Sequence, residues 1–118
     1  MLDKNEKYRV FLKMGRTDMR KSINGLAVEV QTFLKQNPFD KSLFVFCNKR
    51  RNQIKILYWD RNGFCLWQKR LEKDKYMWLK SDNNSMEISM KELEWLLDGL
   101  DYRKAYKTLS YDLHTTVT

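Results

Sequence analysis

The residues best suited to chemistry in this sequence are cations, concentrated in one stretch from Asn48 to Arg70. This basic stretch holds seven lysines and arginines against one carboxylate, a net charge of +6, and the whole chain carries +8. Such side chains neutralise phosphates and release the counterions condensed on a nucleic acid. The pattern predicts a polyanionic partner and leaves DNA, RNA and an acidic protein open. The seven are Lys49, Arg50, Arg51, Lys55, Arg61, Lys69 and Arg70.

Aromatic side chains are interleaved with these cations along the sequence. Tyr58, Trp59, Phe64 and Trp67 all fall within the basic stretch. Rings beside arginines are typical of proteins that stack the bases of single-stranded nucleic acid. A tryptophan inside a strand, however, more often belongs to a hydrophobic core. The core interpretation is favoured for the rings, and the phosphate-binding interpretation for the cations.

Residues that could hold a metal or act as nucleophiles are few. Apart from carboxylates, they are Cys47, Cys65 and His114. The two cysteines are expected on strands that flank a third, about 9–10 Å apart, which is too far for a disulfide bond without rearrangement. The histidine lies in the segment with the weakest pattern. We therefore expect no metal, no cofactor and no enzymatic activity.

A metal-dependent nuclease is the catalytic alternative, because Asp18, Asp60 and Asp101 could contribute carboxylates. Two-metal phosphoryl transfer needs such groups around ions about 4 Å apart. The topology expected below places Asp18 and Asp60 at opposite ends of the domain. A shared metal site between them is therefore not expected.

Hydrophobic periodicity predicts a small antiparallel sheet. Three consecutive strands, joined by the short connections NKRRN and DRNG, should form a meander. The run SLFVFC is apolar on both faces and should be covered on each side, whereas QIKILYW presents Ile54 and Ile56 on one face and Leu57 on the other. The expected strands are Tyr8–Lys13, Ser42–Cys47, Gln53–Trp59 and Phe64–Leu71, with an additional one at Tyr76–Leu79.

One long amphipathic helix is predicted from about Asp18 to Gln36. Thr17 is a suitable N-cap, and Asn37 with Pro38 should end the helix. Gly25 lowers the stability of such a helix by about 1 kcal/mol relative to alanine. Close packing of the helix against the sheet is the expected reason for this glycine.

A second, short helix is predicted near the C-terminus. Ser89 and Glu92 have the spacing of a capping box, and Gly99 is suited to end the helix. The expected fold is α+β: a small antiparallel sheet, a meander of three to five strands, packed by one long helix, with a second short C-terminal helix. The 118 residues fit one domain, residues 1–101, followed by a weakly ordered tail, residues 102–118.

Strand connectivity should collect most of the cations at one end of the domain. In a meander, the loop after the first strand lies beside the end of the third. The long helix should run antiparallel to Ser42–Cys47, bringing its N-terminal N–H groups to the same end. We call this end the basic pole. Its predicted phosphate-binding residues are Arg20, Lys21, Lys49, Arg50, Arg51, Lys69 and Arg70.

The sequence contains no run of about 18 apolar residues, the length needed to span a bilayer. Its first ten residues, MLDKNEKYRV, are charged where a signal peptide would be apolar. We therefore expect a cytoplasmic protein with no membrane partner.

Three segments resemble a known family: TDMRKSINGL (Thr17–Leu26), LFVFCNKRRNQIKILYWDRNGFCLWQKRLE (Leu43–Glu72) and LEWLLDGLD (Leu93–Asp101). They are similar to the TnpB, or Orf2-like, accessory proteins of the insertion sequence sixty-six family of bacterial transposable elements. The resemblance implies a non-catalytic protein that is encoded beside a transposase and needed for transposition. Two departures from the family pattern are Leu79, where proline is usual, and the C-terminal DYRKAYK, which is less rich in arginine.

Two functions stay open at this point. In the first, the protein assists transposition by binding DNA non-catalytically through the basic pole. In the second, it is a protein–protein adaptor for the transposase or another element-encoded protein, without direct DNA contact. The second is motivated by the apolar faces of Ser42–Cys47, and by Leu57 and Trp59, which lie opposite the face that the long helix is expected to cover. A homodimer is one way to cover that open face.

Overall fold

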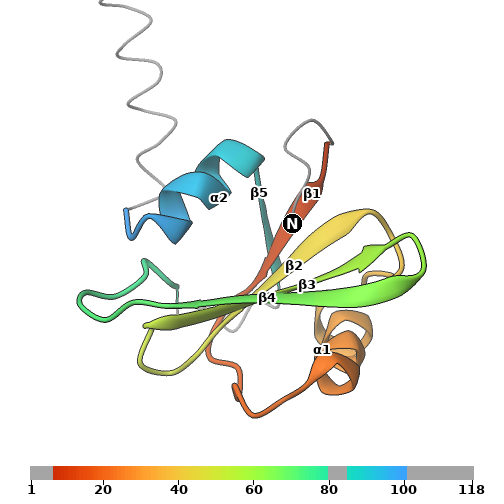
Figure 1. Ribbon diagram of the computed structural model, residues 1–118, viewed down its shortest axis with the longest axis horizontal. Coiled ribbons are helices and arrows are strands. Elements are labelled where there is room, and N and C mark those ends of the chain that lie inside the picture. Colours follow the sequence, from red (N-terminus) through yellow and green to blue (C-terminus); the bar gives the residue numbers. More distant parts are fainter. Residues whose placement is uncertain (1–6, 80–84, 101–118) are drawn as a thin grey trace, which may run out of the picture.

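The computed structural model describes residues 7–79 and 85–100. Its centre is a five-stranded, mostly antiparallel sheet in the order β4-β3-β2-β1-β5 (Figure 1). Only β1 and β2 are parallel neighbours, and the helical segment between them crosses one face of the sheet. The predicted α+β class is confirmed. The strands are β1 (Arg9–Lys13), β2 (Ser42–Cys47), β3 (Gln53–Asp60), β4 (Gly63–Arg70) and β5 (Ser85–Ile88).

The meander of β2, β3 and β4 is confirmed, since the three strands pair in chain order. The additional strand predicted at Tyr76–Leu79 is wrong. Tyr76 and Trp78 are 1% and 4% exposed and belong to the core beneath the sheet, and the backbone N–H of Tyr76 donates to the carbonyl oxygen of Arg51. The edge beyond β1 is formed instead by β5, which pairs Glu87 with Phe11.

The first helix begins five residues later than predicted. α1 (Ile23–Glu29) continues as a π-helical segment, η1 (Val30–Leu34), for 12 helical residues in all. Its N-cap is Ser22, whose side chain makes no capping bond. Thr17, the predicted N-cap, is buried, and its backbone N–H donates to the carbonyl oxygen of Cys47 at 2.8 Å. Because this bond ties Thr17 to the end of β2, the chain stays extended there and the helix begins further along the sequence.

The second helix follows the prediction closely. In α2 (Met90–Leu97), the hydroxyl of Ser89 accepts a hydrogen bond from the backbone N–H of Glu92 at 3.1 Å. The Glu92 carboxylate in turn accepts from the backbone N–H of Ser89 at 2.9 Å, which completes the capping box. Gly99, with a φ of 80°, ends the helix.

The two helices cover opposite faces of the sheet, which gives three layers (Figure 1). On one face, Leu26 and Val30 of the first helix pack against Phe44, Phe46 and Leu57. β2 is thus covered on both sides, as predicted. The face on which Leu57 lies was expected to be open, and that expectation is wrong because α1 and η1 cover it. This open face was one motive for an adaptor or a homodimer, and the fold removes it.

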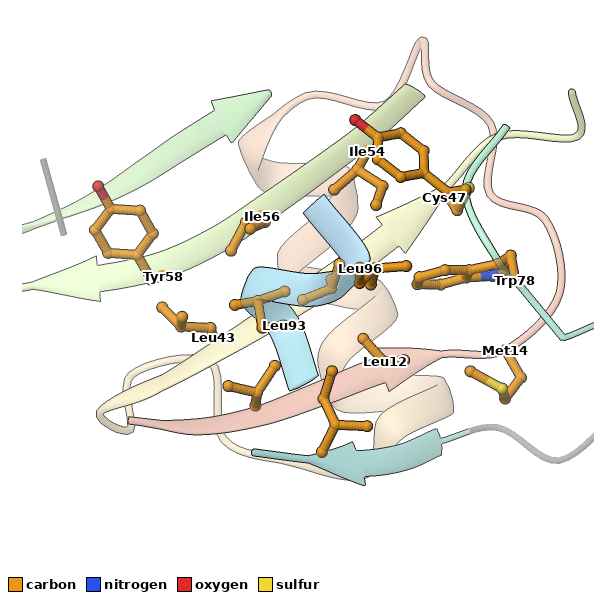
Figure 2. Packing of buried hydrophobic residues seen from close by; sticks show 14 residues of the cluster. Leu12, Met14, Leu43, Cys47, Ile54, Ile56, Tyr58, Trp78, Leu93 and Leu96 are labelled. Carbon is orange, nitrogen blue, oxygen red and sulfur yellow. The ribbon is translucent and has the colours of Figure 1, made fainter. Parts of the chain in front are cut away.

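The other face of the sheet carries the larger part of the core (Figure 2). Leu93 and Leu96 of α2 pack there with Tyr76 and Trp78 against the apolar side chains of β1, β2 and β3. Neither helix within residues 7–79 and 85–100 has the length and apolar character required to cross a membrane. The predicted tail, residues 102–118, lies outside the described residues, so the domain boundary stays a prediction.

Candidate nucleic-acid interface

The loop between β2 and β3 forms the tip of the basic pole. The carbonyl oxygen of Asn48 accepts the backbone N–H of Arg51 at 3.1 Å, which closes a tight turn. The Asn48 side chain accepts the backbone N–H groups of Asn52 and Gln53, each at 3.0 Å, and donates to the Asn52 side chain at 2.7 Å. The loop is therefore a rigid platform rather than a loose connection.

Three predicted phosphate-binding residues stand on this platform without a competing anion. Lys49 and Arg50 are exposed and Arg51 is half-buried. In residues 7–79 and 85–100, none of the three forms an ion pair. A phosphate could bind them without displacing a carboxylate of the protein.

Arg16, which sequence reasoning missed, lies beside this loop. It is exposed, lines two surface hollows together with Lys49, and has no ion pair in the described part of the chain. It was overlooked because it is an isolated cation outside the basic stretch. The sequence could have indicated it, because Arg16 directly precedes Thr17, in a segment already expected at the basic pole.

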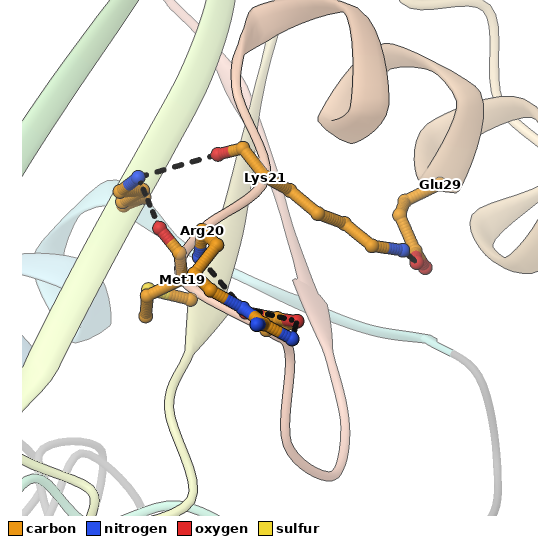
Figure 3. A network of polar contacts seen from close by, with 6 residues as sticks. Met19, Arg20, Lys21 and Glu29 are labelled. Carbon is orange, nitrogen blue, oxygen red and sulfur yellow. Dashed lines mark hydrogen bonds and ion pairs between the residues drawn. The ribbon is translucent and has the colours of Figure 1, made fainter.

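Arg20 and Lys21 reach the same end of the sheet, but carboxylates engage both (Figure 3). The Arg20 guanidinium binds both oxygens of Asp18, at 2.7 and 3.1 Å, and this hydrogen-bonded pairing lowers the pKa of Asp18 to about 2. The Lys21 ammonium binds the buried carboxylate of Glu29, which also lies 3.3 Å from the ammonium of Lys13. Their charges are therefore already partly neutralised.

Gly25 has a different role from the predicted packing against the sheet. A β-carbon added there would lie 3.3 Å from the β-carbon of Lys21. The Lys21 side chain extends to the Glu29 carboxylate (Figure 3), and its β-, γ- and δ-carbons would lie 3.3–3.7 Å from the added carbon. The glycine makes room for this side chain, which ties the start of the helix to its middle.

Lys69 and Arg70, at the end of β4, are also engaged. The Lys69 ammonium donates to the carbonyl oxygen of Leu97 at 2.9 Å, where it caps the C-terminus of α2. Arg70 forms an exposed ion pair with Glu72 at 3.2 Å. The structure thus brings all seven predicted residues to the end of the sheet formed by the β2–β3 loop, and their role as phosphate ligands stays a prediction.

The N–H groups of Arg20 and Lys21 are not the first of a helix, as the predicted start at Asp18 would have made them. Because α1 begins only at Ile23, the preceding N–H groups have other partners: that of Arg20 donates to the Asp18 carboxylate and that of Lys21 to the Asp18 carbonyl. The Lys55 ammonium donates to the carbonyl oxygens of Met19 and Lys21 and so pins this segment to β3. The predicted N–H groups of this segment are therefore occupied by bonds within the chain.

The opposite end of the sheet carries a cluster of rings that we call the aromatic pole: Phe39, Trp59 and Phe64. The ring centroids lie 5.0–5.2 Å apart, and Phe39 is 53% exposed. Tyr58 and Trp67 pack with the core, as predicted. Trp59 is only half-buried, at the rim rather than in the centre. The rings of the aromatic pole therefore lie at the other end of the strands from Lys49 to Arg51, Lys69 and Arg70, whereas Arg61 lies beside them in the β3–β4 turn.

The residues considered for catalysis are dispersed. Cys47 is buried, which raises the pKa of its thiol to about 12, and Cys65 is half-buried; both are free thiols. Asp18 lies at the basic pole, whereas Asp60 is paired with Gly63 at the β3–β4 turn. No group of three metal-binding side chains occurs among the described residues, and residues 101 and 114 fall outside them.

The chain is similar to known proteins over most of its length. A family model described as IS66 Orf2 like protein matches residues 8–107. The uncharacterized protein y4hO of Sinorhizobium fredii is 37% identical over 108 residues, which cover 92% of this chain and 94% of that protein. Protein y4jC of the same organism is 29% identical over 104 residues, 88% of this chain and 89% of that one. No solved structure matches the chain.

Proposed function

Because the chain belongs to the IS66 Orf2-like family of transposition-associated proteins, we propose that it is a non-catalytic accessory protein that binds DNA through the basic pole. The observation that carries the proposal is the rigid β2–β3 loop, which presents Lys49 and Arg50 to solvent, beside Arg16, with no ion pair to either cation in the described part of the chain. Unpaired, exposed cations gain most from a phosphate, since no existing ion pair is lost.

The cations of the basic pole divide into two groups by their present partners. Lys49, Arg50 and Arg51, with Arg16, have no carboxylate partner within the described residues and form the proposed centre of the interface. The other four predicted residues surround this centre and would have to exchange or share a partner. They are Arg20, Lys21, Lys69 and Arg70.

The proposed binding is largely independent of DNA sequence. The central cations stand on a tight loop and neither helix projects from the domain, because both lie against the sheet. Side chains on such a loop contact phosphates, whereas base sequence is read by elements that enter a groove. The protein would therefore hold DNA for the transposase rather than select its sequence.

The deciding experiment is fluorescence anisotropy with a labelled DNA duplex at about 50 to 200 mM salt. The double variant Lys49→Glu/Arg50→Glu should bind about 100-fold more weakly at low salt, and the slope of log K against log salt should fall by about 2. The matched control is Lys41→Glu/Arg61→Glu, which makes the same charge change at the opposite end of the sheet, before the start of β2 and in the β3–β4 turn, and should alter affinity less than about threefold.

Two results would contradict the proposal. One is a native protein that binds no duplex at low salt. The other is an equal loss of binding in both double variants, which would mean that only the net charge matters.

A second role, as an adaptor for the transposase or another element-encoded protein, is favoured by the aromatic pole. Exposed aromatic side chains are enriched at protein interfaces and often dominate their binding energy. Retention of the transposase by the tagged protein in the presence of nuclease and high salt, and its loss in Phe39→Ala, would support this role. Retention that disappears on nuclease treatment would leave DNA as the bridge between the two proteins.

A further inference from the structure

A hollow of about 370 Å³ lies beneath the β2–β3 loop, at the centre of the basic pole. It has two kinds of wall. Arg16, Lys49 and Arg51 line one part, and Trp78 and Leu79 line another. Cavities of this size accommodate small organic molecules, and a mixed apolar and cationic lining suits a ligand with a flat ring system and an anionic group.

Hydrogen bonds fix the backbone around this hollow and the ring of Trp78. The backbone N–H of Gly15 donates to the carbonyl oxygen of Leu79 at 3.0 Å, and the Trp78 indole N–H donates to the carbonyl oxygen of Gly15 at 2.8 Å. On the other side, the backbone N–H of Arg51 donates to the carbonyl oxygen of Asn48 at 3.1 Å, and the carbonyl oxygen of Arg51 accepts the backbone N–H of Tyr76 at 2.6 Å. A preformed hollow loses little conformational entropy when it is filled.

A second hollow, of about 430 Å³, adjoins the first. Arg16 and Lys49 line both, so these two cations stand between them. The second hollow is lined mainly by charged side chains, including the ion-paired Lys21 and Glu29, and has no comparable apolar wall. The first hollow thus has an apolar wall that suits a ring, Arg16 and Lys49 lie beside it, and the second hollow continues from these cations as a polar surface.

We propose that the first hollow receives one unpaired nucleotide of a DNA strand, with its base against Trp78 and Leu79 and its phosphate on Arg16 and Lys49. The phosphates of a duplex can reach the exposed cations, but its bases are stacked and paired, so only an unpaired base can enter a concave site. The strand would continue through the second hollow. This inference rests on the proposed function, because it assigns a ligand to the same pole.

The test compares a twelve-nucleotide oligothymidylate with a duplex of the same length by fluorescence anisotropy. Leu79→Trp fills the hollow and should weaken binding of the single strand about tenfold, with less than a twofold effect on the duplex. Val28→Trp adds a tryptophan at an exposed site on α1 and should change neither affinity. A folded Leu79→Trp variant that binds the single strand as tightly as the native protein overturns the proposal.

A second measurement applies to the native protein and does not depend on the folding of a variant. In a ¹⁵N-labelled sample, the indole N–H signal of Trp78 should move on titration with the oligothymidylate and stay in place with the duplex. The indole signal of Trp59, at the aromatic pole, should stay in place in both titrations. A Trp78 signal that the single strand leaves unchanged overturns the proposal.

Two further outcomes separate this inference from its alternatives. Thymidine monophosphate that moves the Trp78 signal at lower concentration than the oligonucleotide would assign the hollow to a free nucleotide and overturn the strand proposal. Suppose that duplex binding depends on Lys49 and Arg50 and that Leu79→Trp has no effect on single-strand binding. This result would refute the proposal for the hollow and leave the proposed function intact. A native protein that binds neither the single strand nor the duplex would refute both the proposal for the hollow and the proposed function.

Discussion

The basic pole and the aromatic pole are the two ends of the same strands, yet they are built in opposite ways. At the basic pole, hydrogen bonds from Asn48 hold the backbone of a tight loop and leave Lys49 and Arg50 exposed. At the aromatic pole, Phe39, Trp59 and Phe64 lie against one another. One end presents separate charges to solvent, and the other gathers apolar rings.

The difference shows how strand direction sorts a mixed sequence. Cations and rings are interleaved between Asn48 and Arg70, but the eight residues of β3 carry the chain from one pole to the other. A stretch that resembles a single-strand-binding motif in the sequence is therefore two surfaces in space. Trp78, from outside that stretch, is the aromatic residue that lies beside the cations of the loop.

The largest expected effect comes from Glu29→Gln, which removes the buried carboxylate next to the basic pole. Lys13, whose side chain is only 14% exposed, would lose its partner, and the free energy of unfolding should fall by about 3 kcal/mol. Lys21 would be released, so duplex binding should become about twofold tighter at low salt. Urea denaturation and anisotropy measure the two changes.

The control for this variant is Glu94→Gln, which removes the carboxylate of an exposed pair with Lys91 at 3.8 Å. It should change stability by less than about 0.5 kcal/mol. A Glu29→Gln variant as stable as the native protein would show that the buried carboxylate contributes nothing to the fold.

Trp59→Ala disrupts the aromatic pole and leaves the basic pole unchanged. A buried tryptophan replaced by alanine costs about 3–5 kcal/mol, and half-buried Trp59 should cost about 2 kcal/mol. Duplex affinity should change less than about twofold, because no cation of the loop moves. Loss of DNA binding in a folded Trp59→Ala protein would mean that the two poles do not act separately.

Lys69→Met compares the two groups of cations within the basic pole. Methionine keeps an apolar stem but loses the bond to the carbonyl oxygen of Leu97, so stability should fall by about 1 kcal/mol. Its effect on DNA affinity should be smaller than that of Arg50→Met, because Lys69 already has a partner. Equal losses of affinity in the two variants, measured by anisotropy at one salt concentration, would contradict this division.

Much of the fold could be predicted because its signals are local. Short apolar or alternating runs between turn residues predicted β1 to β4, and the capping box predicted the start of α2. β5 could not be predicted, since its four residues pair with a strand more than seventy positions earlier. The start of α1 depended on the bond between Thr17 and Cys47, which joins segments thirty residues apart and leaves no periodic pattern.

The candidate site was predictable in location but not in detail. Turn length and strand order were enough to gather Lys49 to Arg51 near Lys69 and Arg70. The sequence did not predict which cations already have a partner within the protein. The ion pair of Lys21 and Glu29, for example, spans eight residues, whereas ordinary helical pairs are three or four residues apart. The sequence around Arg16 predicted only its place near the basic pole. Its proposed role in binding depends on the two hollows that it lines, which the sequence does not reveal.

The smallest expected effect concerns the exposed pair of Arg20 and Asp18, and it tests why Arg20 lies outside the proposed centre of the interface. The hydrogen bonds from Arg20 lower the pKa of Asp18 to about 2, from an ordinary value of 3.8. Arg20→Gln should raise this pKa part of the way towards 3.8, because the side-chain hydrogen bonds are lost while the backbone N–H of residue 20 can still donate to the carboxylate. An NMR titration of the side-chain carboxyl carbon measures the change. Duplex affinity should fall less than about threefold, because the Asp18 carboxylate already partly neutralises the charge of Arg20.

The sign of the associated stability change follows from the direction of this shift. A carboxyl group whose pKa is lower in the folded state contributes stability that is present above pH 3.8 and is lost as the pH falls towards 2. The native protein should therefore lose this contribution between pH 4 and pH 2, whereas Arg20→Gln should lose a smaller contribution over the same range. A pKa of Asp18 that stays near 2 in the variant would mean that Arg20 is not what holds it down, and Arg20 would then be as available to a phosphate as Arg50.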